Sequence, residues 1–486
     1  MSLEQQVIAW LAQQDLPVYL VGGTIRDRLL RRSIYDLDLA VAGDGLRLAR
    51  RLSNHFDGDY YPLDSERSTG RAILYTVEGS RLIVDVARLR GHDARDLAAD
   101  LADRDFTINA LAADVRAPDA IIDLHGGQAD LRAGLIRPVS PDAIRNDPLR
   151  ALRAVRQAAQ LGFTLAPETE RLMRRHGAGL ADVSAERVRD ELSRLLARPD
   201  AAPWLHRLDD LGLLVVVFPE LASLRGVEQP PPHHLDVLAH SLAAVSALED
   251  ILAYLSPGVG QDTAPPLASL AELLPFAGRV HAHLARETGH NRPGLVILKL
   301  ALLLHDIGKP ASQTVDDDGR IRFLGHPCGG AGIAAEALRR LRFDRAEAQL
   351  VETIVRHHMR PLLLAAQSSV SSRAVYRFFR DTRQAGVDVV LHALADHRAT
   401  YAPGAPDPQG SRLVALAARM LANYWDRQSL YLELTPLLSG RDLLRAFDLA
   451  PGPHIGDLLE IVREAQALGE IHTRDEALSL VKEHLE

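Results

Sequence analysis

The sequence of 486 residues contains a single cysteine, Cys328, so the chain cannot form an internal disulfide bond. That scarcity fits a reducing cytoplasm, which is where we expect this protein. Lysine is also rare: Lys299, Lys309 and Lys482 are the only lysines among 56 basic residues, and arginine supplies the rest. The guanidinium group of arginine is a planar donor fork suited to phosphates and base edges.

An excess of positive charge and long apolar runs are missing too. The net charge is -8, so the chain is not a globally basic nucleic-acid binder, and any RNA contact must come from local patches. The longest apolar run, Leu295–Leu304, contains Lys299 and is too short to cross a bilayer. We therefore expect this run to form a buried helix, and we expect no membrane partner.

The pattern of apolar residues changes along the chain. Before residue 136, short β-branched runs alternate with helical stretches, and after about residue 142 the pattern is almost entirely helical. We expect strands at Val18–Val21, Leu37–Val41, Ala72–Val77 and Leu82–Val86, and helices at Leu46–Phe56, Asp105–Ala113, Pro148–Leu161, Glu168–Arg175 and Ala185–Leu196. Pro-rich or Gly-rich stretches at 229–232 and 402–409 mark boundaries. The prediction is an α+β fold in four parts: 1–136, 137–228, 229–402 and 403–486.

Two glycines, Gly22 and Gly23, follow the first predicted strand. Glycines in such a turn let the backbone approach a phosphate, with amide donors lining the turn. Arg26 lies one turn into the next predicted helix, where it could reach that phosphate. An ordinary turn explains the glycines equally well.

A cluster of acids follows. Asp36 and Asp38 point to the same face of a strand, and Asp85 lies between apolar residues on another predicted strand. Adjacent carboxylates repel one another, and burying them is costly without a cation. Hard oxygen ligands at this spacing suit Mg²⁺ that carries a nucleoside triphosphate. A solvated Asp-x-Asp pair is the alternative for the first two acids alone.

Two further segments carry candidate nucleotide contacts. Arg104 and Asp105 could hold the triphosphate and ribose, although Asp105 could equally cap a helix. Asp147 precedes a proline that starts a helix, and Arg150 lies three residues later on the same face. A carboxylate acceptor beside a guanidinium donor matches the Watson–Crick edges of C and A and mismatches U and G. A capped helix with an intrahelical ion pair is the alternative; Arg153 and Arg156 extend the basic stripe.

Together these motifs resemble the tRNA nucleotidyltransferase/poly(A) polymerase family of the bacterial and eukaryotic type. The matching residues are Gly22-Gly23-x-x-Arg26-Asp27, Asp36-x-Asp38, Arg104-Asp105-Phe106-Thr107-Ile108-Asn109-Ala110, Asp147-x-x-Arg150 and Ser184-x-Glu186-Arg187, in order over roughly residues 15–200. The resemblance implies a polymerase-β-like head with Mg²⁺ on Asp36 and Asp38, followed by a helical neck. It implies transfer of CMP, CMP and AMP from CTP and ATP to the 3′ end of tRNA.

Three departures from the family pattern stand out. Asp103 replaces the first of two arginines before Asp105, and Asn146 replaces a glutamate before Asp147. The segment Arg88–Ala102 is short where members that add the complete CCA usually carry a longer flexible loop. By resemblance, a short segment favours enzymes that add only CC.

A second candidate site lies downstream, where ten of the 20 histidines fall in residues 233–358. Adjacent His305 and Asp306 close the apolar helix and offer ligands of different hardness to one divalent metal. With His240 and Asp396 they resemble the ligand quartet of the HD phosphohydrolase superfamily. His326 and the adjacent pair His357-His358 match positions that often add ligands or phosphate contacts, and of that pair we select His357. We expect His233, His234, His281, His283 and His290 at the surface.

The HD part could hydrolyse a phosphate ester with a metal-activated hydroxide, as a phosphatase or a 2′,3′-cyclic phosphodiesterase. The tail from Leu438 to Gly456 resembles the HD-bearing branch of the same family. The main hypothesis is CCA addition to tRNA. The alternatives are a CC-adding or poly(A)-type enzyme, an HD phosphohydrolase whose head only binds RNA, and a non-catalytic RNA-binding scaffold.

Overall fold

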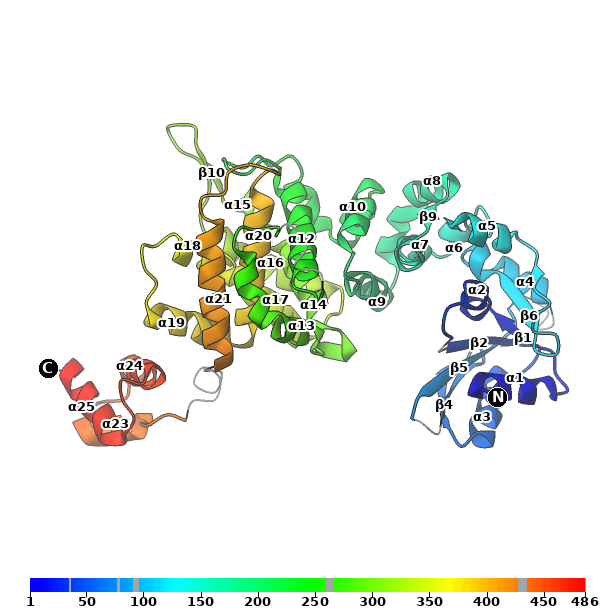
Figure 1. The fold of residues 1–486 in the computed structure, drawn as a ribbon, viewed down its shortest axis with the longest axis horizontal. Helices are drawn as coiled ribbons and strands as arrows, with labels where there is room; N and C mark the ends of the chain where they lie inside the picture. The colour runs from blue at the N-terminus through cyan, green and yellow to red at the C-terminus, as the bar shows by residue number, and fades with distance from the viewer. Residues whose placement is uncertain (35, 77–78, 91–95, 259–264, 427–434, 486) are drawn as a thin grey trace. The chain divides into compact units, whose positions relative to one another are not determined.

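The computed structural model describes residues 1–486 except 35, 77–78, 91–95, 259–264, 427–434 and 486. The chain forms two compact units: residues 1–191 with 207–217, and residues 192–206 with 218–486. The first unit holds a mixed sheet and helices, and the second is almost entirely helical (Figure 1). The predicted α+β fold class is confirmed.

The central sheet of the first unit is mixed. Its described strands lie in the order β3-β4-β5-β2-β1-β6-β7. Strand β2 runs parallel to β5 and antiparallel to β1, which also pairs with β6. The bounds are β1 Val18–Val21, β2 Asp36–Val41, β3 Asp59–Asp64, β4 Thr69–Tyr75, β5 Arg81–Arg88, β6 Leu111–Asp114 and β7 Ile122–Asp123. All four predicted strands exist; Val77, at the end of one prediction, lies outside the described residues.

The two faces of the sheet differ because side chains alternate along each strand. Leu37 and Leu39 on β2 are buried, and helix α3 (Gly45–His55) covers their face of the sheet. The acids of β2 point to the opposite face. Helices α2 (Gly23–Leu29) and α4 (Leu97–Ala102) lie there, and Leu101 of α4 packs in one cluster with Ala40 (Figure 1). The sheet therefore separates an apolar core from the face that carries the acids.

One predicted helix in the first unit is wrong. Residues 105–113 form a short 3-10 helix, Thr107–Asn109, followed by strand β6. Alanine favours a helix locally, but Ala112 pairs with Val21 at the centre of the sheet and is fully buried. Pairing in the sheet outweighs local helix propensity.

Beyond residue 142 the first helices are α6 (Ala143–Asn146), α7 (Leu149–Leu161), α8 (Pro167–His176), α9 (Ala185–Leu196) and α10 (Ala202–Asp210). Of these, α7, α8 and α9 match the predicted ranges closely. The exception is a two-stranded parallel pair, β8 (Leu135–Ile136) with β9 (Thr164–Leu165). The break before α7 comes from Pro148, which lacks an amide donor and occupies the N-cap position of the helix.

The second unit is built around buried helices. Its main elements are α12 (Val237–Tyr254), α13 (Ala277–Ala285), α14 (Gly294–Leu304), α16 (His326–Arg340), α17 (Arg345–His357), α19 (Ser372–Thr382), α20 (Gly386–Thr400) and α21 (Gly410–Asp426), followed by α23 (Gly440–Phe447), α24 (Pro453–Leu468) and α25 (Arg474–Leu485). The predicted buried helix is α14, in which every residue except Leu295 is buried. A small hairpin, Gln313–Val315 with Ile321–Phe323, interrupts the helical pattern.

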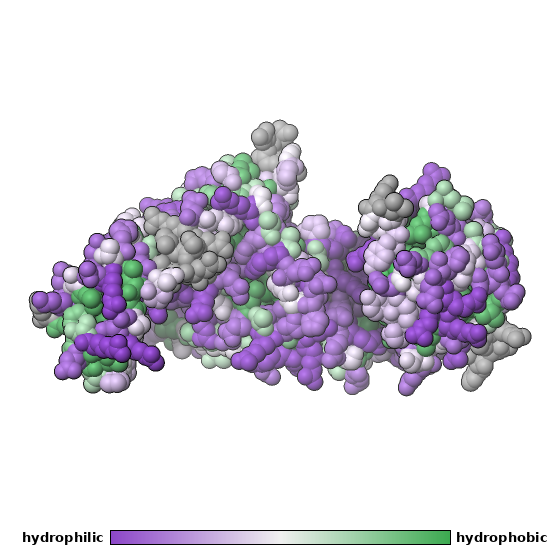
Figure 2. All heavy atoms as spheres, turned by 90° about the horizontal axis from the view of Figure 1, so that it is seen from below, coloured by the Kyte–Doolittle hydropathy of each residue, from purple (hydrophilic) through white to green (hydrophobic). Residues whose placement is uncertain are grey.

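Among the described residues, α12 alone is long and apolar enough to cross a membrane by composition. More than half of its candidate window is buried within the structure, and it carries His240 into the interior. Those properties identify α12 as a core helix. On the face shown in Figure 2, hydrophilic residues dominate and hydrophobic residues form separate small patches.

Candidate functional site

Three carboxylates meet on one face of the sheet in the first unit. Asp38 on β2 lies directly opposite Asp85 on β5 in the parallel register, and Asp36 lies two residues before Asp38. Burial, with Asp85 nearby, raises the pKa of Asp38 to about 6 although Arg104 and Arg26 oppose the shift. The same two causes raise the pKa of Asp36. This arrangement is unfavourable without a counter-ion.

The donor set fits a divalent cation. Carboxylate oxygens on adjacent strands are the ligands that Mg²⁺ prefers, and a cation would relieve the repulsion that raises both pKa values. Asp85 differs from the other two because Arg71 donates to both of its oxygens, at 2.7 and 2.8 Å. Asp36 and Asp38 are therefore the acids with oxygen positions open to a metal.

The two glycines allow a close approach beside these acids. Gly22 has a φ of 63°, and a Cβ there would lie 2.8 Å from Arg104 Nη1 and 3.6 Å from Asp38 Oδ2. Gly23 begins α2, and a Cβ on it would lie 3.1 Å from Asp38 Oδ2. The sequence analysis missed Thr24, whose hydroxyl accepts a 2.6 Å hydrogen bond from the Asp38 amide. Thr24 thereby fixes the position of β2 against α2.

Arg26 and Arg104 flank this turn and are both engaged within the protein. Arg26 donates to Asp27 and, at 2.8 Å, to Asn109 Oδ1. Arg104 donates to Asp100 at 2.8 Å and to the carbonyl of Asn109 at 3.4 Å. Their guanidinium groups lie beside the glycines and the acids, where a triphosphate would need positive charge.

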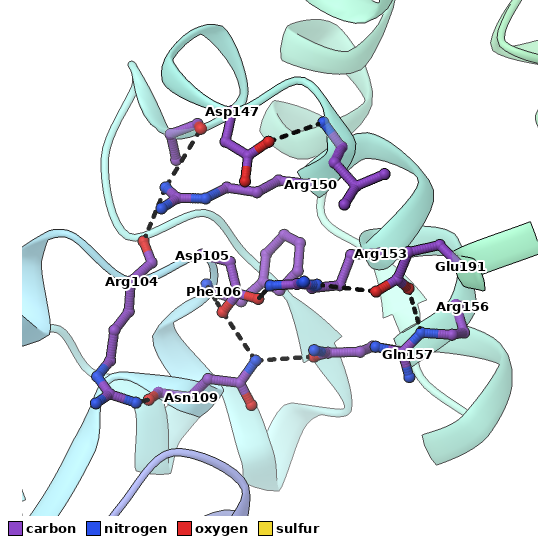
Figure 3. A network of polar contacts seen from close by, with 12 residues as sticks. Arg104, Asp105, Phe106, Asn109, Asp147, Arg150, Arg153, Arg156, Gln157 and Glu191 are labelled. Carbon is purple, nitrogen blue, oxygen red and sulfur yellow. Dashed lines mark hydrogen bonds and ion pairs between the residues drawn. The ribbon is translucent and has the colours of Figure 1, made fainter. Parts of the chain in front are cut away.

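Asp105 is buried beneath this region. Burial alone would raise its pKa, but Arg153, the Asn109 amide and the backbone N–H of Phe106 together lower it. Asn109 Nδ2 donates to both Asp105 and Gln157. The capping alternative does not describe the structure, because Phe106, not Asp105, is the N-cap of the 3-10 helix. Asp105 instead connects the sheet region to α7 (Figure 3).

Arg150 lies at the start of α7, and its side chain is held rigidly. Its Nη2 donates to the carbonyl of Asp103 at 2.6 Å, and its Nη1 to those of Arg104 and Ala143 (Figure 3). Asp147 pairs with Arg187 of α9 at 2.8 Å, so the intrahelical pair with Arg150 that we considered is not the contact formed. Arg150 contacts the backbone carbonyl of Arg104, and the guanidinium group of Arg104 lies beside Gly22 and Asp38. Arg104 therefore connects the start of α7 to the predicted metal-binding acids.

Arg153 and Arg156 complete the network on α7. Both donate to Glu191 of α9, which is almost fully buried, and Arg153 also contacts Asp105 at 3.4 Å. Figure 3 shows this row of contacts running from Asn109 through α7 to Glu191. Sequence reasoning missed Glu191 and Gln157; their spacing on α9 and α7 is typical of any amphipathic helix, so no local signal marks them.

The second unit contains a buried cluster of histidines and aspartates. Its members His240, His305, Asp306 and Asp396 are at most 5% exposed. His240 Nε2 lies 2.9 Å from Asp396, and His305 Nε2 lies 3.1 Å from Asp306 and 3.7 Å from Asp396. Ligand atoms of His240, His305 and Asp396 lie within 4.8 Å of one another, and so do those of His305, Asp306 and His358. Buried groups of this composition fit a divalent metal.

One predicted neighbour of this cluster is wrong. His357 points away, and His358 lies inside, with Nε2 3.3 Å from His326 Nε2. The missed signal is a buried stripe on α17, Val351, Ile354 and Val355, which continues to position 358 at helical spacing. Burial lowers the pKa of His358 to about 3. His326 lies in the cluster as predicted, 3.3 Å from Asp306 Oδ1.

His392 is a further member that the sequence analysis missed. It lies one helical turn before Asp396 on α20 and is completely buried, with its ring 4.9 Å from that of His305. Neither of its ring nitrogens has a hydrogen-bond partner among the described residues. Lys309 Nζ also contacts Asp306 Oδ2, at 2.5 Å. The cluster is therefore larger than the predicted quartet.

The expectation that five other histidines lie at the surface is only partly correct. His234 and His290 are exposed, but His233, His281 and His283 are partly buried. The ring of His233 packs edge-on against His240, and His283 donates to the buried Asp388 at 3.0 Å. Tertiary packing buries these rings, and their local sequence gives no sign of it.

Comparisons with known proteins agree with this architecture. Family models match four segments: poly A polymerase head domain (18–137), probable RNA and SrmB-binding site of polymerase A (162–224), HD domain (277–423) and tRNA nucleotidyltransferase domain 2, putative (413–481). An A-adding tRNA nucleotidyltransferase of Deinococcus radiodurans is 34% identical, with 95% of this chain and 94% of the relative covered. A CC-adding tRNA nucleotidyltransferase of Thermus thermophilus is also 34% identical, with 96% and 95% covered.

The fold agrees with a solved structure of a CCA-adding enzyme in complex with ATP. That comparison gives a TM-score of 0.63 at 18% identity and covers 99% of this chain and 94% of the other. Sequence likeness over nearly the full length, together with the acid cluster, establishes the relationship. The chain belongs to the tRNA nucleotidyltransferase/poly(A) polymerase family and is a nucleotidyltransferase with an HD domain behind its head and neck.

Proposed function

We propose that this chain adds CMP from CTP to the 3′ end of tRNA and that its product ends in CC. The observation that supports nucleotide addition is the acid cluster of Asp36 and Asp38 beside Gly22 and the Arg104 guanidinium, with Arg150 bound to the backbone carbonyl of Arg104. Mg²⁺ held by Asp36 and Asp38 would neutralise the triphosphate and activate the 3′ hydroxyl. The 3′ oxygen, on losing its proton, bonds to the α-phosphate of CTP, and the bond between the α- and β-phosphates breaks to release pyrophosphate. Asp85, which is paired with Arg71, adds a third negative charge beside Asp36 and Asp38 and so increases their need for a cation.

The remaining side chains take positioning roles in this proposal. Arg26 and Arg104 offer guanidinium groups to the triphosphate beside the two glycines. Asp105 and Asn109, buried below them, orient the ribose, and Arg153 holds Asp105 in place. These groups are already fixed by hydrogen bonds, so nucleotide binding loses little side-chain entropy.

Base selection belongs to Asp147 and Arg150. The carboxylate accepts from the exocyclic amine of C or A, and the guanidinium donates to the adjacent ring nitrogen. U and G present the reverse order and leave polar groups unpaired, which costs about 1–3 kcal/mol for each buried group. Asp147 is only partly exposed, and Arg150 is buried, so the mismatch cannot be relieved fully by water.

The connection between β5 and α4 favours CC as the product. Only residues 89–96 separate the two elements. A site that accepts cytosine must rearrange to accept the larger adenine, and the family members that add the complete CCA usually carry a longer segment at this point of the sequence. The CC-adding relatives of Thermus thermophilus and Geobacter sulfurreducens match more than 90% of their length to this chain.

Complete CCA addition is the second candidate, because the Asp147–Arg150 pair matches the edges of both C and A. AMP addition alone is a third candidate, since the relative of Deinococcus radiodurans is named an A-adding enzyme.

The deciding experiment supplies tRNA lacking CCA, tRNA ending in C and tRNA ending in CC with each nucleotide alone and with CTP and ATP together. Sequenced products that end in CC even with ATP present support our proposal. AMP incorporation onto a CC end overturns it.

We also propose that the HD domain binds a divalent metal through His240, His305, Asp306 and Asp396 and hydrolyses phosphate esters at RNA ends. The supporting observation is the buried convergence of these four side chains. RNAs with 2′,3′-cyclic or terminal phosphates test this activity. His305→Ala should abolish it and leave nucleotide addition intact, and Asp38→Ala should do the reverse. Phosphate release that persists in His305→Ala contradicts the proposal.

A further inference from the structure

The two base-reading side chains are held in different ways. Arg150 is buried, and three backbone carbonyls hold its guanidinium group. Asp147 makes one side-chain contact, a 2.8 Å bond from Arg187 Nη2 to its Oδ2, and its Oδ1 accepts a longer bond from the Leu149 amide. Arg150 is therefore fixed, whereas the main partner of Asp147 is another side chain.

The ion pair of Asp147 can open. The side chain of Arg187 is 50% exposed and that of Asp147 is 25% exposed. Glu191 lies one turn further along α9 and pairs with Arg153 and Arg156. The side chain of Glu191 is only 4% exposed, so these ion pairs are shielded from solvent. A solvent-exposed pair contributes little free energy, so water or a ligand can replace Arg187 at small cost.

Arg187 and the amine of an incoming base need the same oxygen. Both are N–H donors, and Oδ2 of Asp147 already accepts from Arg187. When a base with an exocyclic amine displaces the guanidinium group of Arg187, its amine N–H donates to the carboxylate in place of the arginine. A base with a carbonyl at that position displaces Arg187 and leaves the carboxylate facing another acceptor.

We propose that Arg187 is a positioning residue that occupies Asp147 and is exchanged for the amine of the incoming nucleotide. This inference rests on the proposed role of Asp147 in base selection. Arg187 aims the carboxylate and competes with every nucleotide, so it lowers the affinity for CTP. It also stabilises the fold, because it ties α9 to the segment before α7. Arg187 therefore weakens nucleotide binding but strengthens the fold.

Two measurements on the full chain test this competition. Calorimetry gives the affinity for each nucleotide, and thermal unfolding gives the stability of the fold. Arg187→Ala should bind CTP about two- to fivefold more tightly, the size expected from losing an exposed competing ion pair. The affinity for UTP should increase by the same factor, so the ratio of the dissociation constants for CTP and UTP should stay constant. The melting temperature should fall slightly. Arg187→Lys keeps a charged donor and should bind CTP nearly as the unaltered protein does.

Two controls separate competition from general damage. Arg171→Ala removes an exposed arginine of α8 that pairs only weakly with Glu168, and it should change neither measurement. In an Asp147→Asn background, Arg187→Ala should no longer tighten CTP binding. Weaker or unchanged CTP binding by Arg187→Ala overturns this inference alone. Failure of the unaltered protein to bind CTP overturns the proposed function as well.

Discussion

At the residue scale, the environment of Asp38 decides how the site responds to pH. The carboxylate shares one face of the sheet with Asp36 and Asp85, and burial and Asp85 raise its pKa to about 6. A carboxyl group with a raised pKa binds its proton more tightly in the folded protein than in the unfolded chain. Its contribution to stability in metal-free protein therefore decreases as pH rises from near 3.8 through 6.

Magnesium binding should therefore depend on pH in the same range. Mg²⁺ binds the ionised carboxylate, so binding should release a proton near pH 6, and the affinity should weaken below pH 6 by up to about tenfold per pH unit. Magnesium titrations at pH values on both sides of 6 measure this dependence. Asp85→Asn removes the neighbouring charge and should move the transition to lower pH. An unchanged transition in that variant would show that Asp85 does not cause the shift.

The carboxylate of Asp147 should decide which bases are accepted. In Asp147→Asn the side-chain amide can rotate to present a donor or an acceptor, so the preference for CTP over UTP should narrow. We expect a loss of about 1–2 kcal/mol, or roughly five- to thirtyfold in the ratio of the kcat/KM value for CTP to that for UTP. Single-nucleotide extension of tRNA measures the ratio. Asp142→Asn, which alters an exposed carboxylate of the same segment, is the matched control and should leave the ratio unchanged.

At the element scale, buried charges connect helices that hydrophobic packing alone would leave free to slide. In the first unit, Glu191 links α9 to α7 through Arg153 and Arg156. In the second unit, Lys299 of α14 is completely buried and donates to Glu249 of α12 and to the carbonyl of Arg198, both at 2.5 Å. Glu249 also accepts from the backbone amides of residues 201 and 202. Each network fixes the register of several elements at one point.

Lys299→Ala should destabilise the second unit strongly. The substitution leaves the Glu249 carboxylate in a nearly buried site with its charge uncompensated, at a cost of about 3–5 kcal/mol. Thermal or urea unfolding followed by circular dichroism measures the loss. Lys482→Ala removes an exposed lysine of α25 and should change stability by about 0.5 kcal/mol or less. Equal stability of the two variants would show that the buried pair contributes nothing.

At the scale of the whole molecule, the chain carries two sets of candidate metal-binding side chains, one in each compact unit. The first set consists of carboxylates that are partly open to solvent, which suits exchange of a nucleotide-bound Mg²⁺. The second combines buried histidines and aspartates, which suits a metal held tightly by the protein. The proposed nucleotide addition and phosphate hydrolysis should therefore be separable by substitution.

A metal in the HD cluster should stabilise the second unit. A divalent ion at about 100 times its dissociation constant stabilises the folded state by about 2.7 kcal/mol, so chelation should lower its melting temperature. Calorimetry with and without a chelator, after screening of several divalent ions, measures the difference. His305→Ala should abolish it. His290→Ala, at an exposed histidine paired with Asp344, should retain it; loss of the difference in both variants would contradict the assignment.

The sequence determined four of the strands, most helices and the Asp-x-Asp and His-Asp motifs of the two candidate sites, because those features depend on local patterns. Period-two runs identify β2 and β5, and the apolar run before His305 identifies α14. The Asp-x-Asp and His-Asp motifs place ligands on elements whose faces are set by helix and strand periodicity. The family resemblance, confirmed over nearly the full length, comes from the order of these motifs.

The tertiary structure alone decided which side chains meet. Ala112 and Ala113 have helical propensity but join the sheet, because pairing with β1 buries them. His358 rather than His357 enters the HD cluster, and His392 joins it, because helix packing selects the buried face. The pairing of Asp147 with Arg187, forty residues away, follows from the packing of α9 against α7. Such contacts depend on distances between elements, and no local pattern of residues encodes those distances.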